Sequence, residues 1–386
     1  MQKKPVLTAT QLTLMSVGSA MVFPYTFMPI LNAPPANQDV WIVLLLTFAY
    51  ILLLNLPLLF LMHKFRGINV CEATELMMGK VFGKVVLAPV VLFCLFCHIA
   101  CMLITGIFIS IYIFPNTPIW ALLIFMVVPV SYAVFKGAGT IGRLSTFIVP
   151  FALFSVVLFF VFSIPEMDFN EFQPILVEST FLQINFGAFL TAARYSEILI
   201  FWVFSYYLMQ KSSIKKPYAA TLLIFAFSFF LILIPTVTVL GLEYAQHAWN
   251  PYYTFTRQIE VLAFLERMQA INLMAWFPCA LLKLALYNYM TCHILSGIFR
   301  TKSYKSLIIP VSAVSYIVCL LPFMNKASTI EQLRSDQVFP FFILPTIFVI
   351  PLILLIVYLI RKKRVNRLLS QRKSQAATTP SSVNNS

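Results

Sequence analysis

Charged residues are scarce in this sequence: Asp, Glu, Lys and Arg make up 10% of the 386 residues, whereas hydrophobic residues make up 60%. Soluble globular domains carry about 25% charged residues, so the composition excludes an ordinary soluble domain. The mean hydropathy of +0.89 indicates a protein of the lipid bilayer. A bilayer admits only helices or closed barrels, because lipid offers no partner to a free backbone group. The apolar runs are long and continuous rather than alternating, which predicts an all-α integral membrane protein.

Catalytic motifs are missing as well. The 11 glycines form no Gly-rich phosphate loop, and the sequence shows no catalytic triad and no pair of catalytic carboxylates. We therefore expect that the protein is not an enzyme and that it holds no cofactor.

Cysteine usage predicts neither a disulfide framework nor a metal centre. The chain has seven cysteines, an odd number, and six of them fall inside apolar segments, where cysteine behaves as a small hydrophobe. The run from Cys94 to His98 matches the CxxCH pattern of haem attachment. Cys97 and Cys101 share a helical face with His98, as metal ligands would. Haem attachment of that kind occurs on exported, accessible chain, so we interpret this face as packing or pocket lining.

The formal charge of +14 is concentrated near one end of the chain. Seven of the 27 basic residues lie between Arg361 and Lys373. Such a cluster after an apolar segment is typical of a membrane-surface anchor, so we predict no nucleic-acid partner. We expect residues 1–363 to form one polytopic transmembrane domain and residues 364–386 to form a cytoplasmic tail, basic at first and then disordered. The first apolar stretch, Thr8 to Leu31, is longer than a typical signal core, so no cleavable signal peptide is expected.

Apolar windows between charged or turn-rich breaks predict ten membrane-spanning helices. The predicted spans are residues 8–31, 40–62, 85–113, 118–135, 144–164, 181–209, 218–242, 264–297, 306–323 and 339–360. Of the 27 Lys and Arg residues, 21 fall in termini and loops on the side of the N-terminus, four in the opposite loops and two within spans. Because cytoplasmic loops are enriched in basic residues, both termini are predicted to be cytoplasmic.

Two segments between the spans are predicted to be helical without crossing the membrane. Residues 64–84 place apolar residues on one helical face and Lys, Glu and Asn elsewhere, which is typical of an interfacial helix. Residues 251–267 are predicted to form a similar element on the opposite side of the membrane.

Three charged side chains fall inside the predicted spans, where burial in lipid is expensive and indicates function. Arg194 and Glu197 are three residues apart, so a continuous helix would bring them together as an internal ion pair. Alternatively, one of them faces a polar cavity and senses substrate charge or a proton. Lys283 lies too deep to reach either surface and needs Glu197, a helix C-terminus or water nearby. It is either the structural partner of a carboxylate, or a proton-linked switch or fixed substitute for a metal cation.

Small residues interrupt two of the spans. The first span carries Ser16 to Ala20 followed by Pro24, and the sixth carries Gly187 to Ala193 before Arg194. Gly and Pro release backbone groups from the helical ladder, which lipid tolerates only where these groups face protein, water or a ligand. Broken helices near the bilayer midplane are typical of transporters built from inverted repeats. The same small residues also suit plain helix packing.

Four stretches of the chain have a recognisable pattern. They are Gln11 to Pro24 (QLTLMSVGSAMVFP), Gly139 to Pro150 (GTIGRLSTFIVP), Tyr195 to Tyr207 (YSEILIFWVFSYY), and Pro251 to Lys283 with Arg257, Phe264 to Arg267 and Trp276. On these stretches the sequence resembles the B subunits of the nutrient germinant receptors of endospore-forming bacteria. These subunits form the spore permease family within the amino acid–polyamine–organocation superfamily. The resemblance extends over residues 5–365.

The resemblance implies a fold and a set of partners. The expected fold has ten helices in two inverted five-helix repeats, with a site at the breaks of helices one and six and walls from helices three and eight. The expected partners are a receptor A subunit and a lipoprotein C subunit in the inner membrane of the spore. There, an amino acid or another small nutrient would trigger germination.

The resemblance also picks out candidate site residues by analogy of fold. They are Gly18 and Ser19 at the first break, Cys97, Cys101 and Thr105 from helix three, Ala193 and Glu197 from helix six, and Tyr287 and Asn288 from helix eight. Arg194, Glu197 and Lys283 form the candidate charge network.

Two functions are compatible with this site. A receptor subunit binds a nutrient and needs only a ligand that discriminates between two conformations, whereas a proton-coupled amino acid transporter must open to both sides of the membrane. We favour the receptor because the resemblance extends over the whole chain.

Overall fold

The computed structural model describes residues 6–208, 213–259, 269–321 and 343–378, and helices dominate these residues. Leu7 and Leu208 form an isolated parallel β-bridge. The helices of the described residues are α1 (Ala9–Met21), η1 (Pro29–Asn32), α2 (Val40–Lys64), α3 (Val70–Met78), α4 (Lys80–Tyr112), α5 (Ile119–Lys136), α6 (Ala138–Ser163), η2 (Ile164–Glu166), η3 (Phe169–Phe172), α7 (Phe181–Tyr195), α8 (Ile198–Phe204), η4 (Ser205–Tyr207), α9 (Lys215–Leu240), α10 (Leu242–His247), α11 (Pro251–Gln258), α12 (Gln269–Phe299), η5 (Tyr304–Leu307), α13 (Ile308–Leu320), η7 (Pro345–Val349), α16 (Ile350–Ile360) and α17 (Lys362–Thr378).

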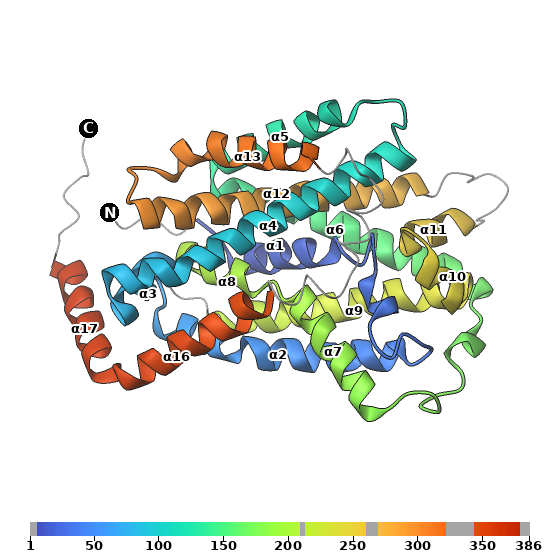
Figure 1. Ribbon diagram of the computed structural model, residues 1–386, viewed down its shortest axis with the longest axis horizontal. Helices are drawn as coiled ribbons and strands as arrows, with labels where there is room; N and C mark the ends of the chain where they lie inside the picture. Colours follow the sequence, from blue (N-terminus) through green and yellow to red (C-terminus); the bar gives the residue numbers. More distant parts are fainter. Residues whose placement is uncertain (1–5, 209–212, 260–268, 322–342, 379–386) are drawn as a thin grey trace.

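The helices form an elongated bundle whose long members run roughly along one axis (Figure 1). Among the described residues, seven helices are long and apolar enough to cross a membrane. The segment Pro345–Ile360 passes the same test together with the bent helix that follows it, and Tyr304–Leu320 is a shorter apolar helix. The first span is short because it is broken after Met21. These long, short and broken helices are compatible with the ten predicted spans. They confirm the predicted all-α membrane fold.

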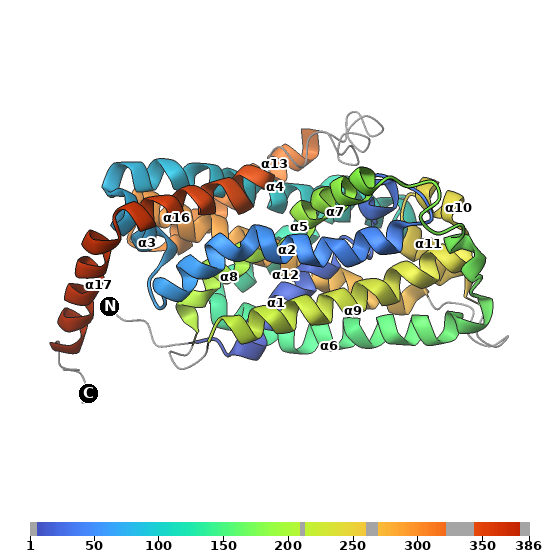
Figure 2. The same ribbon diagram turned by 90° about the horizontal axis from the view of Figure 1, so that it is seen from below.

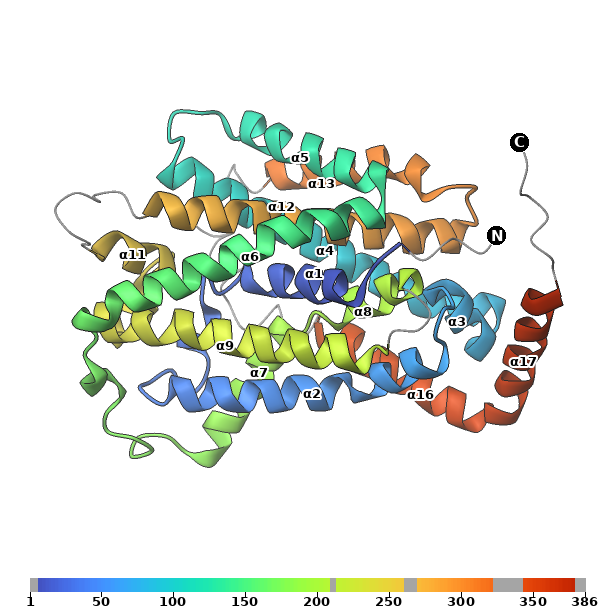
Figure 3. The same cartoon turned by 180° about the vertical axis from the view of Figure 1, so that it is seen from behind.

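Helix α1 lies in the middle of the bundle and packs against α6, α9 and α12 (Figure 3). Gly18 makes this close approach possible, because a Cβ atom at this position would lie 2.6 Å from Val149 Cγ2 and 3.0 Å from Leu282 Cδ2. Outward-facing side chains such as Phe147 and Leu223, which are 79% and 72% exposed, present apolar surface to the surroundings. The central position of α1 places its broken end among the most deeply buried residues.

The predicted interfacial segment contains α3. Val70, Ala73 and Met77 are buried on one face of this helix, in agreement with the amphipathic pattern. The helix ends at Gly79, which has a φ of 89°, and α4 begins at the next residue. The expected counterpart at residues 251–267 contains α11.

Helix α17 includes the basic start of the predicted tail and continues to Thr378, into the part after Leu369 for which we predict disorder. Val365 is fully buried on this helix and Leu369 is partly buried, so packing supplies the stabilisation that composition alone does not predict. Helix α17 turns away from α16 by 87° and lies across the end of the bundle (Figure 2).

Some predicted features lie outside the described residues. They are residues 260–267 with the motif Phe264 to Arg267, the start of the span predicted at 264–297, the end of 306–323, the start of 339–360, and residues 379–386 of the tail.

The orientation predicts a labelling pattern. Helix α17 lies at one end of the bundle, and α10 and α11 lie at the opposite end (Figure 1). In intact cells, we expect a membrane-impermeant thiol reagent to label an E166C variant, whereas a K363C variant is labelled only after permeabilisation. Both positions are exposed, and all seven native cysteines are buried, so the background is low. Labelling of K363C in intact cells would contradict the predicted orientation.

Candidate functional site

A buried ion pair lies at the centre of the bundle. Lys283, in the middle of α12, donates a hydrogen bond from Nζ to Glu197 Oε1 at 2.6 Å. The same ammonium donates to the backbone oxygen of Ser19 at 3.1 Å and lies 4.3 Å from the centroid of the Phe23 ring. The two charged side chains are only 2% and 7% exposed. Lys283 thus has two of the three alternative partners expected from the sequence, the Glu197 carboxylate and a backbone oxygen near the C-terminal end of a helix.

The first span is broken just beyond the small residues of α1. Gly18 and Ser19 are still helical, and α1 ends at Met21. Pro24 has no N–H to donate to the oxygen of Ala20, which is why the helical ladder stops here. The chain then turns as far as Met28, whose φ of 42° lies in the left-handed region. The break therefore falls a few residues later than the run of small residues indicates.

The sixth span is broken at Ser196 and Glu197, between α7 and α8. The Ser196 hydroxyl donates to Asn55 Oδ1 of α2 at 2.9 Å, and Asn55 Nδ2 donates to the Tyr218 hydroxyl of α9 at 2.8 Å. These bonds attach the break to α2 and α9.

The break also separates Arg194 from Glu197. Because α7 ends at Tyr195, the two charged residues do not share one continuous helical face, and the expected helical ion pair is replaced by the pair of Glu197 with Lys283. The half-buried Arg194 instead lines a small cavity beside η1.

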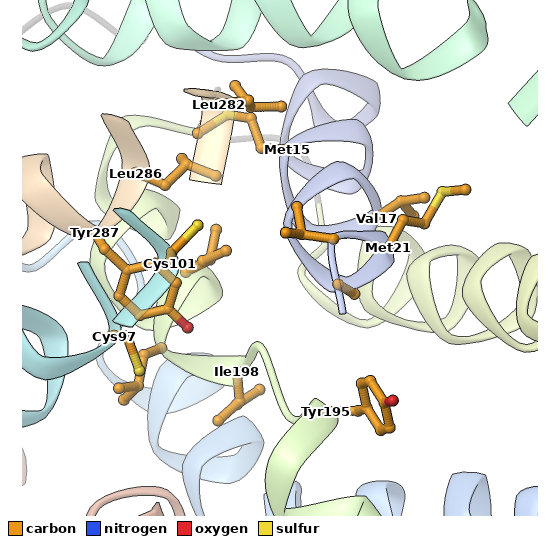
Figure 4. Packing of buried hydrophobic residues seen from close by; sticks show 14 of the residues in the cluster. Met15, Val17, Met21, Cys97, Cys101, Tyr195, Ile198, Leu282, Leu286 and Tyr287 are labelled. Atoms are coloured by element: carbon orange, nitrogen blue, oxygen red, sulfur yellow. The ribbon is translucent and has the colours of Figure 1, made fainter. Parts of the chain in front are cut away.

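Most of the candidate site residues gather around this ion pair. Tyr287, one turn after Lys283, donates its hydroxyl to Glu197 Oε2 at 2.8 Å, so both carboxylate oxygens are bonded. Cys97 and Cys101 of α4 lie beside the Tyr287 ring (Figure 4). Thr105 follows on α4, and Ala193 comes just before the sixth-span break; both are fully buried.

Two buried hydroxyl groups on α1 lack a partner. Ser16 Oγ and Ser19 Oγ are fully buried and make no hydrogen bond within the described part of the chain. An unsatisfied buried polar group costs about 1–3 kcal/mol. A polar ligand or an ordered water at the site would recover this free energy.

Asn288 faces a different polar cluster. Its Nδ2 donates to Ser312 Oγ of α13 at 3.0 Å and lies 3.5 Å from His98 Nε2. Ser312 in turn lies 2.9 Å from Ser131 Oγ of α5. The structure therefore separates Asn288 from the other candidate residues. His98 lies 3.0 Å from the backbone oxygen of Leu284, and within the described residues no group of His, Cys, Asp and Glu is arranged to hold a metal ion.

Aromatic pairs lie before and after Lys283 along α12. Towards α11, the Phe108 and Trp276 rings lie 4.5 Å apart, and the Tyr25 and Tyr252 rings lie 5.2 Å apart. Towards the termini, the Tyr289 ring stacks on His293 with the two centroids 5.7 Å apart. These contacts enclose the centre of the bundle.

Sequence reasoning missed three residues of this site. Phe23 covers the ammonium, and Asn55 and Tyr218 anchor the sixth-span break. Asn55 could have been found from the sequence, because it is a lone amide inside an otherwise apolar span. A polar side chain within the membrane needs a hydrogen-bond partner. Nothing in the pattern distinguishes Phe23 from the 37 other phenylalanines.

The ion pair predicts a coupled effect of two substitutions. Lys283→Met leaves the Glu197 carboxylate buried without its cation, which costs about 3–5 kcal/mol. We expect lower thermal stability of the purified protein and partial recovery in the Lys283→Met/Glu197→Gln double variant, which removes both charges. Lys302→Met, an exposed control, should leave the melting temperature unchanged. Additive losses in the double variant would show that the two side chains are not coupled.

Comparison with solved structures places the fold among transporters. MhsT, solved in complex with L-phenylalanine, superimposes with a TM-score of 0.59 over 92% of this chain and 99% of its own, at 12% identity. A mutant form of the manganese transporter of Eremococcus coleocola superimposes with a TM-score of 0.54 over 97% of this chain and 89% of its own, at 15% identity. At these identities the likeness establishes the fold alone.

Sequence comparison establishes the family. The model of the family described as spore germination protein matches residues 6–327. Two proteins of Bacillus subtilis (strain 168) are similar along most of their length: the putative spore germination protein YfkT, 25% identical over 87% of this chain and 90% of its own, and spore germination protein KB, 23% identical over 85% and 89%. This multi-pass membrane chain belongs to the spore germination protein family.

Proposed function

We propose that the chain is the membrane subunit of a nutrient germinant receptor and that it binds a small polar nutrient, an amino acid, between the two broken spans. The observation that carries this proposal is the contact of one buried ammonium, Lys283 Nζ, with Ser19 at the first break and Glu197 at the second. Any ligand that alters this contact changes the relative position of the two breaks.

The polar groups at the first break suit the charged ends of an amino acid. The unpartnered hydroxyls of Ser16 and Ser19 can donate to a carboxylate. The backbone oxygen of Ala20, which Pro24 cannot bond, can accept from an ammonium group. The similar fold of MhsT, which was solved with L-phenylalanine, supports an amino acid as the ligand.

Lys283 gives the site a fixed positive charge. Its ammonium lies where a bound metal cation would otherwise neutralise Glu197 and the end of α1. A site of this kind needs no coupling ion from solution, and we expect the response to the nutrient to be the same in sodium-containing and sodium-free buffer.

The proposed partners are those that the family resemblance implies. We propose that the subunit acts with a receptor A subunit and a lipoprotein C subunit in the inner membrane of the spore, and that binding biases a conformation these subunits recognise. The similarity to spore germination protein KB, a relative over most of the chain, supports a role in germination.

Removal of one hydroxyl should weaken the response to the nutrient. Ser19→Ala deletes an unpartnered hydroxyl and leaves the backbone oxygen that Lys283 contacts. Loss of one ligand hydrogen bond should raise the half-maximal nutrient concentration for germination about tenfold, at an unchanged level of protein in the membrane. The matched control is Ser315→Ala, because within the described residues the buried Ser315 hydroxyl bonds only to the backbone oxygen of Val311 of its own helix. Equal responses of wild type and Ser19→Ala would contradict the proposed site.

Transport is the alternative, and reconstitution separates it from sensing. The purified chain in proteoliposomes is tested for uptake of the labelled amino acid that triggers germination, with and without a proton gradient. Binding without accumulation supports the receptor. Sustained accumulation that depends on the proton gradient supports a proton-coupled transporter, in which Glu197 or Lys283 would exchange the proton.

A further inference from the structure

A charged groove lies at the end of the bundle where α17 turns away. Its volume is about 280 Å³. One wall comes from α3 and the start of α4, with Glu72, Glu75 and Lys80. The other wall comes from the turn between α16 and α17 and the start of α17, with Arg361, Arg364 and Val365. We propose that this groove binds the phosphate-containing headgroup of an anionic phospholipid.

The charges of the groove favour an anion. Three basic side chains, Lys80, Arg361 and Arg364, line it, against the carboxylates of Glu72 and Glu75. Glu75 Oε1 also lies 3.5 Å from a guanidinium nitrogen of Arg300, a fourth cation from outside the groove. Guanidinium groups present paired donors that match the oxygens of a phosphate group.

The backbone at the groove adds to this preference. The 33-residue helix α4 begins at Lys80, and Gly79, its N-cap residue, offers no side chain to bond the first N–H groups. The N-terminus of a helix carries a partial positive charge and free N–H donors. Arg361 on the opposite wall is held in place, since its Nη1 donates to the backbone oxygen of Met77 at 3.3 Å.

Apolar surface continues from both walls of the groove. Directly after Lys80, Val81 and Phe82 are 71% and 67% exposed. Directly before Arg361, Leu359 and Ile360 are 53% and 77% exposed. A ligand whose phosphate lies among the basic groups would therefore meet apolar side chains on either side, which suits the acyl chains of a lipid and not a free phosphate ion.

The acidic residues of the groove indicate which anionic headgroup it prefers. Glu72 lines the groove beside the basic side chains and can accept a hydrogen bond from a headgroup hydroxyl. Phosphatidylglycerol combines a net negative charge with two such hydroxyls, whereas phosphatidylcholine has no net charge and no donor. The groove is thus suited to phosphatidylglycerol.

Lipid retention tests this site in the full chain. The protein is purified in detergent, and native mass spectrometry measures binding of added phosphatidylglycerol, phosphatidylcholine and glycerol 1-phosphate. We expect wild type to prefer phosphatidylglycerol and the Arg361→Gln/Arg364→Gln variant to bind it at least about tenfold more weakly, because charge-assisted hydrogen bonds are lost. The matched control is Lys362→Gln/Lys363→Gln, which removes the same charge from exposed positions of α17 outside the groove.

The outcomes decide between sources of the phosphate. Equal losses in the groove variant and the control would overturn the site, since they would indicate diffuse attraction to the basic helix. Glycerol 1-phosphate binding as tightly as the lipid would overturn the lipid assignment. The single variant Arg364→Gln keeps the contact of Arg361 with Met77 and serves as the test if the double variant fails to fold.

Discussion

The buried ion pair between Lys283 and Glu197 is the interaction on which the centre of this protein depends. Two opposite charges inside a membrane protein are tolerated only when each finds the other and the remaining polar groups are bonded. Here Glu197 also accepts from Tyr287, and Lys283 also donates to Ser19. The charges can be satisfied together only when α1, the sixth-span break and α12 meet at one point.

The rest of the core is arranged to bring these elements together. Gly18 lets α1 approach α6 and α12, and the bonds from Ser196 through Asn55 to Tyr218 hold the sixth-span break against α2 and α9. Each broken span is thus attached to helices that are themselves continuous. A ligand at the breaks would act on two short helical segments against a rigid frame, which suits a protein that passes on a conformational bias.

Because charged residues are scarce in this chain, a cluster of them outside the membrane also indicates a candidate binding site. The basic cluster near the C-terminus attaches to the bundle through Val365, and α17 and α3 together form a groove that neither helix forms alone. The central site and this groove lie at different depths along the bundle. We propose the first for a nutrient and the second for the lipid in which the protein resides.

The sequence by itself determined the all-α membrane class, the neighbourhood of both breaks and the need of Lys283 for a carboxylate, because these follow from the cost of burying charge and free backbone groups in lipid. Only the tertiary structure decided where the breaks fall, with α1 ending at Met21 and Glu197 leaving the helix of Arg194. It also turned Asn288 towards α13 and ordered α17 against α3. The physical reason is that the local sequence pattern shows which buried polar groups need a partner. Which partner each group contacts depends on how helices distant in the sequence pack against one another.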